Sequence, residues 1–391
     1  MRFRRVLRAL LAVAAAVLTL AACGGPDTLQ TTSARVPMPA GAQVSFDDVE
    51  IDQATQTVYA ADRANSGVDV FDVSGARPTF IKTIKLPAPP NGLAIDPMSG
   101  RVFAGTASGS IAIIDIATGT VAGEIKTPAK DVDLLDFAPG PDLLLAGTGA
   151  NGTVLTIDAA TNKLIATANI GAPVEQPRYD LASGNVYVAV PDKAALIAIQ
   201  PKTGALNGTI KLSACIPLGM ALRGSTAVIA CHNSVVAYDL KSGKQTDLGG
   251  IQDGDVVHYF PGVDRFFVTS PHVGVQTPVG MYGGDPVTYM GSTRLDGGGR
   301  AAVYDARNDT VYTTDPRTKS AGLIGFQMGG THPTSVTETA LIAGGPIVAL
   351  FLLVLPLWLL LGRHADPINR EDLEPQPEAR HERKAKSKLT A

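Results

Sequence analysis

Tryptophan is almost missing from this chain of 391 residues, because the only one is Trp358. Repeats built around a recurring Trp-Asp pair are therefore excluded. The chain also lacks the Gly-x-Ser-x-Gly, His-Glu-x-x-His, phosphate-loop and dinucleotide-binding patterns. The enzyme classes that these motifs mark are therefore not indicated, and the sequence assigns no catalytic residue.

Positive charge is scarce in the central part of the chain. Residues 23–362 hold 22 Lys and Arg against 30 Asp and Glu, a net charge of −8, while the first 22 residues carry four Arg and no acid. A domain with that charge repels a phosphate backbone. Nucleic acid is therefore not expected as a partner.

The stretch 89–126 has the pattern of four short strands separated by turns. Its apolar segments are GLAI, RVFAG, SIAIID and TVAGEIK, and the turn clusters DPMSG, TASG and ATG lie between them. Glycine accepts the positive φ angles that tight turns need, and proline presets the bend. A lone four-stranded meander cannot bury both of its faces, so this unit needs copies of itself.

Six further copies become visible when the second strand is aligned on its central large residue. These central residues are Tyr59, Phe103, Leu145, Tyr187, Ile229, Phe267 and Tyr312, spaced by 44, 42, 42, 42, 38 and 45 residues. Seven four-stranded units of about 40 residues are the signature of a β-propeller. We therefore predict an all-β, seven-bladed β-propeller over residues 43–330. The expected blades are 43–87, 88–128, 129–173, 174–215, 216–254, 255–297 and 298–330.

Residues 1–22 have the form of a bacterial export signal. Four arginines precede an apolar run of 14 residues from Ala9 to Ala22, which is too short to span a bilayer. The run ends in Leu-Ala-Ala before Cys23, which resembles the lipobox of bacterial lipoproteins. The resemblance implies cleavage before Cys23 and a diacylglycerol on its sulfur, and an ordinary signal peptide with a chance cysteine is the alternative. Residues 23–42 are small, polar and proline-rich, which predicts a flexible tether.

Residues 340–361 are 22 consecutive uncharged, mostly apolar residues, which is the length of a transmembrane α-helix. Arg363 follows at once, while the linker 331–339 has no Lys or Arg, so the tail 362–391 is expected in the cytosol. The tail is charged and without aromatics, which predicts disorder. The propeller is then expected on the extracytoplasmic side of the cytoplasmic membrane. A buried core helix is the alternative, but an all-β chain offers little for it to pack on.

Two of the three cysteines, Cys215 and Cys231, are expected to lie close together. Cys215 falls at the junction of the fourth and fifth blades, and Cys231 falls at the end of a second strand. In a propeller these two positions lie on the same face, and an exported chain meets an oxidising compartment. We predict a disulfide that closes about 15 residues and contributes roughly 3 kcal/mol, with two buried free thiols as the alternative.

The same face is the expected place of a ligand site, because its loops carry many charged and polar residues. The candidates are Asp62, Arg63, Asn91, Asp131, Glu175, Asp192, His232, Asp255, His258, His272 and Asp315. Such a funnel could bind a divalent cation, although no cofactor is predicted and charged loop residues are usually only solvated. Blade 6 adds an irregular, glycine-rich segment after Ser270, which is either a functional loop or a tolerated surface insertion.

The stretches 89–126 and 174–212 resemble the YVTN-type propeller repeat. A Pro-x-Gly entry, an apolar second strand and a hairpin ending in Asp-x-x-Thr-Gly recur in that repeat, and here Asn91-Gly92 and Ile111 to Gly119 match it. The resemblance covers about residues 43–330. It implies a secreted or surface-attached seven-bladed propeller, often without known activity.

Two functional hypotheses follow. The first is a membrane-anchored extracytoplasmic propeller that acts as a binding or scaffold module for a protein or small ligand, with a membrane or envelope protein as partner. The alternative is a metal-dependent, lactonase-like propeller hydrolase. That alternative requires three or four carboxylate, amide or imidazole side chains to converge on a divalent cation that activates water.

Overall fold

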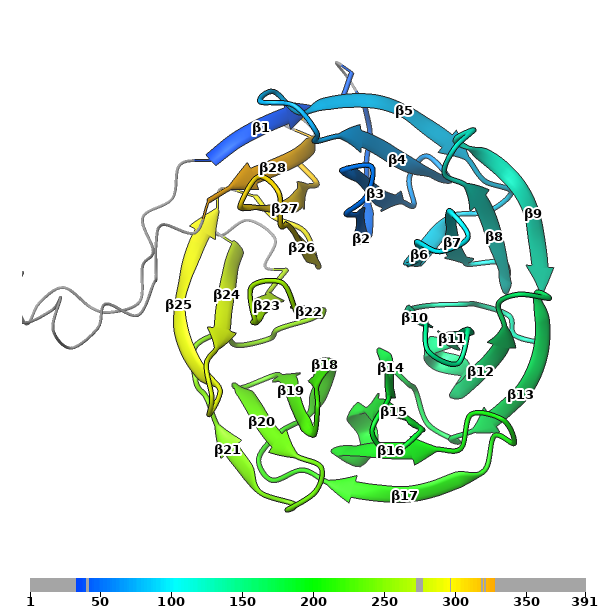
Figure 1. The fold of residues 1–391 in the computed structure, drawn as a ribbon, viewed down its shortest axis with the longest axis vertical. Helices are drawn as coiled ribbons and strands as arrows, with labels where there is room; N and C mark the ends of the chain where they lie inside the picture. The colour runs from blue at the N-terminus through cyan, green and yellow to red at the C-terminus, as the bar shows by residue number, and fades with distance from the viewer. Residues whose placement is uncertain are drawn as a thin grey trace, which may run out of the picture. The chain divides into compact units, whose positions relative to one another are not determined.

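The computed structural model describes residues 33–39, 42–271, 277–295, 297–317, 319 and 321–327. They form seven four-stranded antiparallel sheets, which follow one another around a ring (Figure 1). The predicted all-β, seven-bladed propeller is confirmed. Because neighbouring strands in each blade are also neighbours in the chain, every blade except the last is a simple meander.

The first four blades account for sixteen strands. Blade 1 is β2 (Phe46–Asp52), β3 (Thr57–Asp62), β4 (Gly67–Asp72) and β5 (Thr79–Lys85). Blade 2 is β6 (Pro90–Asp96), β7 (Arg101–Thr106), β8 (Ser110–Asp115) and β9 (Thr120–Lys126). Blade 3 is β10 (Leu135–Ala138), β11 (Leu143–Gly147), β12 (Thr153–Asp158) and β13 (Lys163–Asn169), with the 3₁₀ turn η1 (Gly149–Asn151). Blade 4 is β14 (Pro177–Asp180), β15 (Asn185–Val190), β16 (Ala195–Ile199) and β17 (Leu206–Lys211), with η2 (Pro191–Lys193).

The remaining strands form three blades. Blade 5 is β18 (Pro217–Arg223), β19 (Thr226–Cys231), β20 (Val235–Asp239) and β21 (Gln245–Asp247). Blade 6 is β22 (Val257–Phe260), β23 (Arg265–Thr269), β24 (Thr277–Gly283) and β25 (Thr288–Leu295). Blade 7 is β26 (Ala302–Asp305), β27 (Thr310–Asp315), β28 (Gly322–Phe326) and β1 (Ser33–Pro37).

The seventh blade corrects the predicted boundaries. Its fourth strand comes from the N-terminal side of the chain, because β1 pairs with β28 from Ser33 opposite Phe326 to Pro37 opposite Gly322. Residues 33–37 are therefore not part of a flexible tether, and residues 298–330 do not make a complete blade. The ring is closed by a strand from each end of the propeller sequence.

Blade 6 is also more regular than its sequence indicates. The glycine-rich segment after Ser270 contains β24 and β25, which pair along their length with one register shift. Residues 272–276, between β23 and β24, lie outside the described residues. The segment is therefore mostly sheet rather than an inserted loop.

Burial explains the different composition of the four strands in a blade. The second strands are apolar and buried on both sides, as in β7, whereas the fourth strands are largely exposed, as in β9. Apolar side chains of adjacent blades pack together, and one cluster joins Tyr59 and Val68 of blade 1 to Leu93 and Val102 of blade 2. Each such residue contributes about 1.5–3 kcal/mol when fully buried.

The recurring Asp-x-x-Thr-Gly pattern is a turn that follows the third strand. Asp115 accepts hydrogen bonds from the backbone N–H of Thr118 (2.7 Å) and from its hydroxyl (2.8 Å), and Gly119 adopts φ +59°. Asp158 repeats both bonds with Thr161. These bonds hold the pKa of both carboxyls below the usual range. The motif therefore specifies a turn that lets the chain start the fourth strand.

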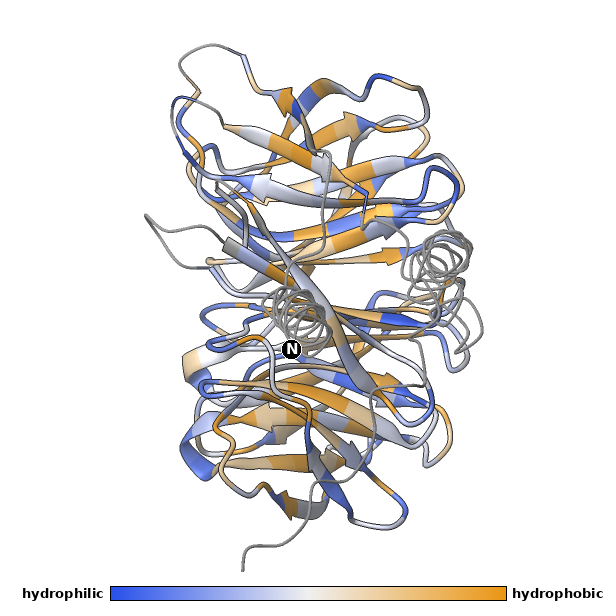
Figure 2. Ribbon diagram, turned by 90° about the vertical axis from the view of Figure 1, so that its left-hand side faces the viewer, coloured by the Kyte–Doolittle hydropathy of each residue, from blue (hydrophilic) through white to orange (hydrophobic). Residues whose placement is uncertain are grey.

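Because successive strands of a blade are antiparallel, the turns between them lie alternately on the two faces of the ring. Face A carries the connections from first to second strand and from third to fourth strand of each blade. Face B carries the connections from second to third strand and from one blade to the next. The side view in Figure 2 shows apolar residues along the strands and mostly polar residues in the turns at both ends.

The predicted export signal 1–22, Cys23, the linker 331–339, the transmembrane helix 340–361 and the tail 362–391 lie outside the described residues. Among the residues that the structure describes, no helix is long and apolar enough to cross a membrane.

Candidate functional site

Polar side chains of the innermost strands join each blade to the next. Five such hydrogen bonds join a side chain in or just before the first strand of one blade to the backbone of the following blade. Three side chains accept a backbone N–H: Asp48 from Leu93 (2.9 Å), Asp136 from Tyr179 (3.1 Å) and Gln176 from Met220 (2.9 Å). Two side chains donate to a backbone carbonyl: Asn91 to Val132 (2.8 Å) and His258 to Ala302 (2.9 Å). Many of the polar side chains near the ring axis are therefore engaged in hydrogen bonds between neighbouring blades.

Arg178 makes the most extensive of these connections. Its guanidinium donates to the carbonyls of Met220 (3.1 Å), Val257 (3.3 Å) and Leu135 (3.3 Å), and it forms an ion pair with Asp136 at 3.3 Å. The side chain is 12% exposed. One arginine therefore ties together the first strands of blades 3, 4, 5 and 6.

Glu50 is a carboxylate near the axis that makes no such bond to the following blade. Its Oε1 lies 3.5 Å from Nε2 of His258, and no Lys or Arg in the described part of the chain forms an ion pair with it. Nδ1 of His258 must donate to the Ala302 carbonyl, so Nε2 of the neutral ring carries no proton and can accept.

Burial sets the protonation of this pair. It lowers the pKa of His258 to about 4, and the charge of the nearby Arg178 acts in the same direction. Burial also raises the pKa of Glu50 well above its usual range; repulsion from the Asp48 carboxylate adds to the rise, and attraction to Arg178 opposes it. At neutral pH the imidazole is therefore uncharged.

Glu50 and His258 lie in a cavity of about 660 Å³. Its charged and ionisable lining residues are Glu50, Asp136, Arg178, Arg223 and His258, and its aromatic walls are Phe137, Tyr179, Tyr259 and Phe260. The lining also includes Pro139, Leu181, Gly224 and Pro261, which lie in or beside the turns between first and second strands of blades 3 to 6. The cavity is therefore on the face A side of the ring, and its volume suits a small organic ligand.

Face B carries a different group of charges around the ring axis, which we call the acidic mouth. It consists of Asp47, Asp131, Asp133, Glu175 and Asp255 with Arg63 and Arg300. Arg300 pairs with Asp255 (2.6 Å) and with Asp47 (3.3 Å), and Arg63 pairs with Asp47 (2.6 Å). Burial, together with the neighbouring carboxylates, raises the pKa of both Asp133 and Glu175 to about 7.

The predicted ligand residues divide into four sets. Arg63, Asn91, Asp131, Glu175 and Asp255 do come together at or beside the acidic mouth. Asp192 and His232 are exposed on the same face, where His232 Nδ1 lies 2.8 Å from Asp253. His272 lies outside the described residues.

Three predicted residues are placed differently from the expectation. Asp62 is fully buried and accepts the backbone N–H groups of Ser45 (3.0 Å) and Ala64 (3.1 Å). Asp315 is also fully buried and pairs with Arg35 and Arg317. His258 belongs to strand β22 rather than to a blade-to-blade loop, and it lines the cavity of face A.

The sequence reasoning missed Glu50 and Asp136 because it examined only loops. The first strand of blade 1, FDDVEID, alternates acidic and apolar residues, with Asp48, Glu50 and Asp52 at every second position. In an all-β repeat chain, an innermost strand with polar residues in alternation points to polar groups around the axis. That signal could have identified Glu50.

The metal-dependent hypothesis needs several ligands at one point. Among the described residues, no group of three His, Cys, Asp or Glu side chains is placed to hold a metal ion. The closest carboxylates of the acidic mouth are instead paired with Arg63 and Arg300.

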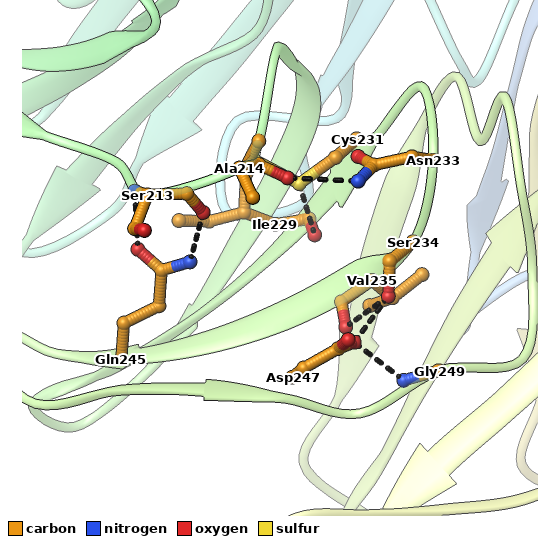
Figure 3. Close-up of a disulfide and its surroundings, with 11 residues drawn as sticks. Ser213, Ala214, Ile229, Cys231, Asn233, Ser234, Val235, Gln245, Asp247 and Gly249 are labelled. Atoms are coloured by element: carbon orange, nitrogen blue, oxygen red, sulfur yellow. Dashed lines mark hydrogen bonds between the residues drawn. A yellow bond between two sulfur atoms is a disulfide. The ribbon is translucent and has the colours of Figure 1, made fainter.

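Cys215 and Cys231 form a disulfide in blade 5, with their Cα atoms 5.2 Å apart. Both are buried, and the surrounding turns are tied by hydrogen bonds from Asn233 to the Ala214 carbonyl (2.9 Å) and from Gln245 to the Ser213 carbonyl (2.7 Å) (Figure 3). The bond joins the segment before β18 to the end of β19. It thus pins the entry of the innermost strand to its neighbour on face B.

Replacing both cysteines by alanine is expected to lower the free energy of unfolding by about 3 kcal/mol, because the unfolded chain regains the freedom of the closed loop. Equilibrium unfolding in guanidinium chloride, followed by circular dichroism, measures the loss. Dithiothreitol should destabilise the parent protein and leave the double variant unchanged. Equal stability of the two proteins would contradict the prediction.

Comparison of the chain with protein-family models and with curated proteins gave no match. The class that the structure defines is a seven-bladed β-propeller with a ligand-sized cavity on one face. This is the fold that the YVTN-type resemblance implies, and membership of that family stays a prediction.

Proposed function

We propose that the protein is an extracytoplasmic binding module that holds a small cationic ligand in the cavity of face A. In this proposal a lipid on Cys23 and the helix 340–361 anchor it in the cytoplasmic membrane, with the tail 362–391 in the cytosol. A membrane or envelope protein is the expected partner. The lipobox-like Leu-Ala-Ala-Cys and the uncharged 22-residue run support the two anchors.

One observation carries the binding proposal: in the described part of the chain, Glu50 forms no ion pair with a Lys or Arg at the polar end of an aromatic-walled cavity. A carboxylate and aromatic faces together attract an ammonium group, through charge and through the ring quadrupole. The two arginines of the lining, Arg178 and Arg223, already pair with Asp136 and Asp264, so an anionic ligand would face the Glu50 carboxylate without a free cation beside it. The apolar walls favour a ligand that carries an alkyl or aryl body beside its charge.

A matched series of hexylamine, hexanol and hexanoate tests the proposal on the full chain in lipid nanodiscs. Calorimetric titration should show that hexylamine binds most tightly and that hexanoate does not bind. Glu50→Gln should weaken hexylamine binding about tenfold or more, because it removes a charge-assisted interaction worth about 1.5–3 kcal/mol. Glu124→Gln, on the exposed strand β9, is the matched control and should bind like the parent.

Binding should also depend on pH. Because burial raises the pKa of Glu50, the carboxyl is protonated at low pH and the affinity for the ammonium group should rise as the pH is raised. The Glu50→Gln variant should lose this dependence. Equal affinity for the three compounds, or an unchanged pH profile in the variant, would refute the proposed ligand class.

A further inference from the structure

The first and last strands of the described propeller have their free ends side by side. Ser33, where β1 begins, is paired with Phe326, where β28 ends. A third strand ends and a fourth strand begins at face A, so both ends lie at the face A edge of blade 7. Gln327 agrees with this placement, because its amide donates to the carbonyl of Asn308 (3.5 Å) in the turn between β26 and β27.

The chain between these ends and the predicted anchors is short. Ser33 is ten positions after Cys23, and the predicted helix begins at residue 340, fourteen positions after Phe326. At no more than about 3.6 Å per residue, these segments reach about 36 and 50 Å. The face A edge of blade 7 is therefore held within about 36 Å of the bilayer if both anchors are used.

The exposed apolar residues lie at the same end of the ring. Eight large apolar side chains are exposed in the described residues, and seven of them lie on the face A side. Met98 (88% exposed) and Leu181 (78%) are in turns between first and second strands. Ile81, Val121, Leu164, Ile165 and Leu206 are within the first three residues of fourth strands, which begin at face A. Ile216 is on the face B side, just before β18.

Charge does not distinguish the two faces. The acidic mouth lies around the axis on face B, but the turns of face A also carry surface carboxylates, such as those of Asp115 and Asp158. The strand ends and the exposed apolar residues are therefore the two observations that favour face A as the side next to the membrane.

We propose that face A lies against the outer surface of the lipid bilayer, so that the cavity of Glu50 and His258 opens toward the lipid headgroups. This inference rests on the proposed function for its two anchors. It identifies the ligand of the cavity as an amphiphile taken from the membrane, with an ammonium head for Glu50 and an apolar body for the walls. Leu181, which is both exposed and part of the cavity lining, would lie at the lipid interface.

A pair of single-cysteine variants in blade 4 tests the orientation. Leu181→Cys places a thiol on face A and Asp192→Cys places one on face B, and both positions are exposed turns. Cys215 and Cys231 are bonded and Cys23 carries the predicted lipid, so a fluorophore attaches only at the new thiol. The labelled full chains are reconstituted in vesicles of phosphatidylethanolamine and phosphatidylglycerol that contain spin-labelled lipid.

We expect quenching by the spin-labelled lipid to be several-fold stronger for the label at position 181 than for the label at position 192. Equal or reversed quenching in membrane-bound protein would overturn the orientation and leave the proposed binding function standing. Loss of the protein from membranes after a carbonate wash would overturn the anchors and the orientation together. Circular dichroism melting of both labelled variants must match the parent, which confirms that the labels report on the folded propeller.

Discussion

Replacing Val36 by aspartate is expected to lower the free energy of unfolding by about 3 kcal/mol or more, because it buries a carboxylate without a partner. Val36 is 3% exposed and packs in a cluster with Tyr312 and Leu323 of blade 7 and with Phe46 and Phe71 of blade 1. Among the described strands, its strand β1 forms backbone hydrogen bonds with β28 alone. The substitution therefore disturbs the packing of β1, the strand that closes the ring.

Ala34→Asp is the matched control for this prediction. It adds the same charge two residues away on the same strand, at an exposed position. Guanidinium chloride unfolding of both variants, followed by circular dichroism, should show a large loss for Val36→Asp and a change of about 0.5 kcal/mol or less for Ala34→Asp. Equal losses would mean that β1 does not close the ring in solution.

Arg178→Met should be the most destabilising substitution near the axis, with an expected loss of about 3–5 kcal/mol. It removes the donor for three carbonyls from three blades and leaves the Asp136 carboxylate without its ion-pair partner. Breaking a buried pair on one side costs more than the pair contributes, because the remaining charge stays in a medium of low polarity.

Two further variants distinguish this cause from a general sensitivity to loss of arginine. Arg223→Met breaks an ion pair with Asp264, whose side chain is 46% exposed, and should cost about 1 kcal/mol or less. Adding Asp136→Asn to Arg178→Met removes the unpaired charge and should restore part of the lost stability. Similar losses for Arg178→Met and Arg223→Met in chemical unfolding would refute the proposed role of Arg178.

The fold could be predicted from the sequence because each blade is built from local contacts. The aligned second strands, such as those around Phe103 and Tyr187, are apolar on both sides and are bounded by turns with a recognisable mechanism. The strand β1 could not be recognised in this way. SARVP is only five residues long and lies in a proline-rich stretch, and Phe326, which pairs with its first residue, lies almost 300 residues further along the chain.

The site was less accessible to sequence reasoning, for a physical reason. An aspartate after a strand can face a ligand or can bind the backbone of its own turn, and the sequence does not distinguish these fates. Asp131 reaches the acidic mouth, whereas Asp62 is fully buried against backbone N–H groups. Glu50 was missed because its importance arises from the absence of a basic partner, which depends on packing across the ring.

The pairing of Ser33 with Phe326 has a mechanical consequence. If both anchors hold, any force that lifts the propeller from the membrane pulls on β1 and β28 at their adjacent ends and in the same direction. The two strands then carry the load in parallel, and the hydrogen bonds between them experience no opposing shear. A ring closed by its two end strands can thus be tethered twice without the tethers pulling its closure apart.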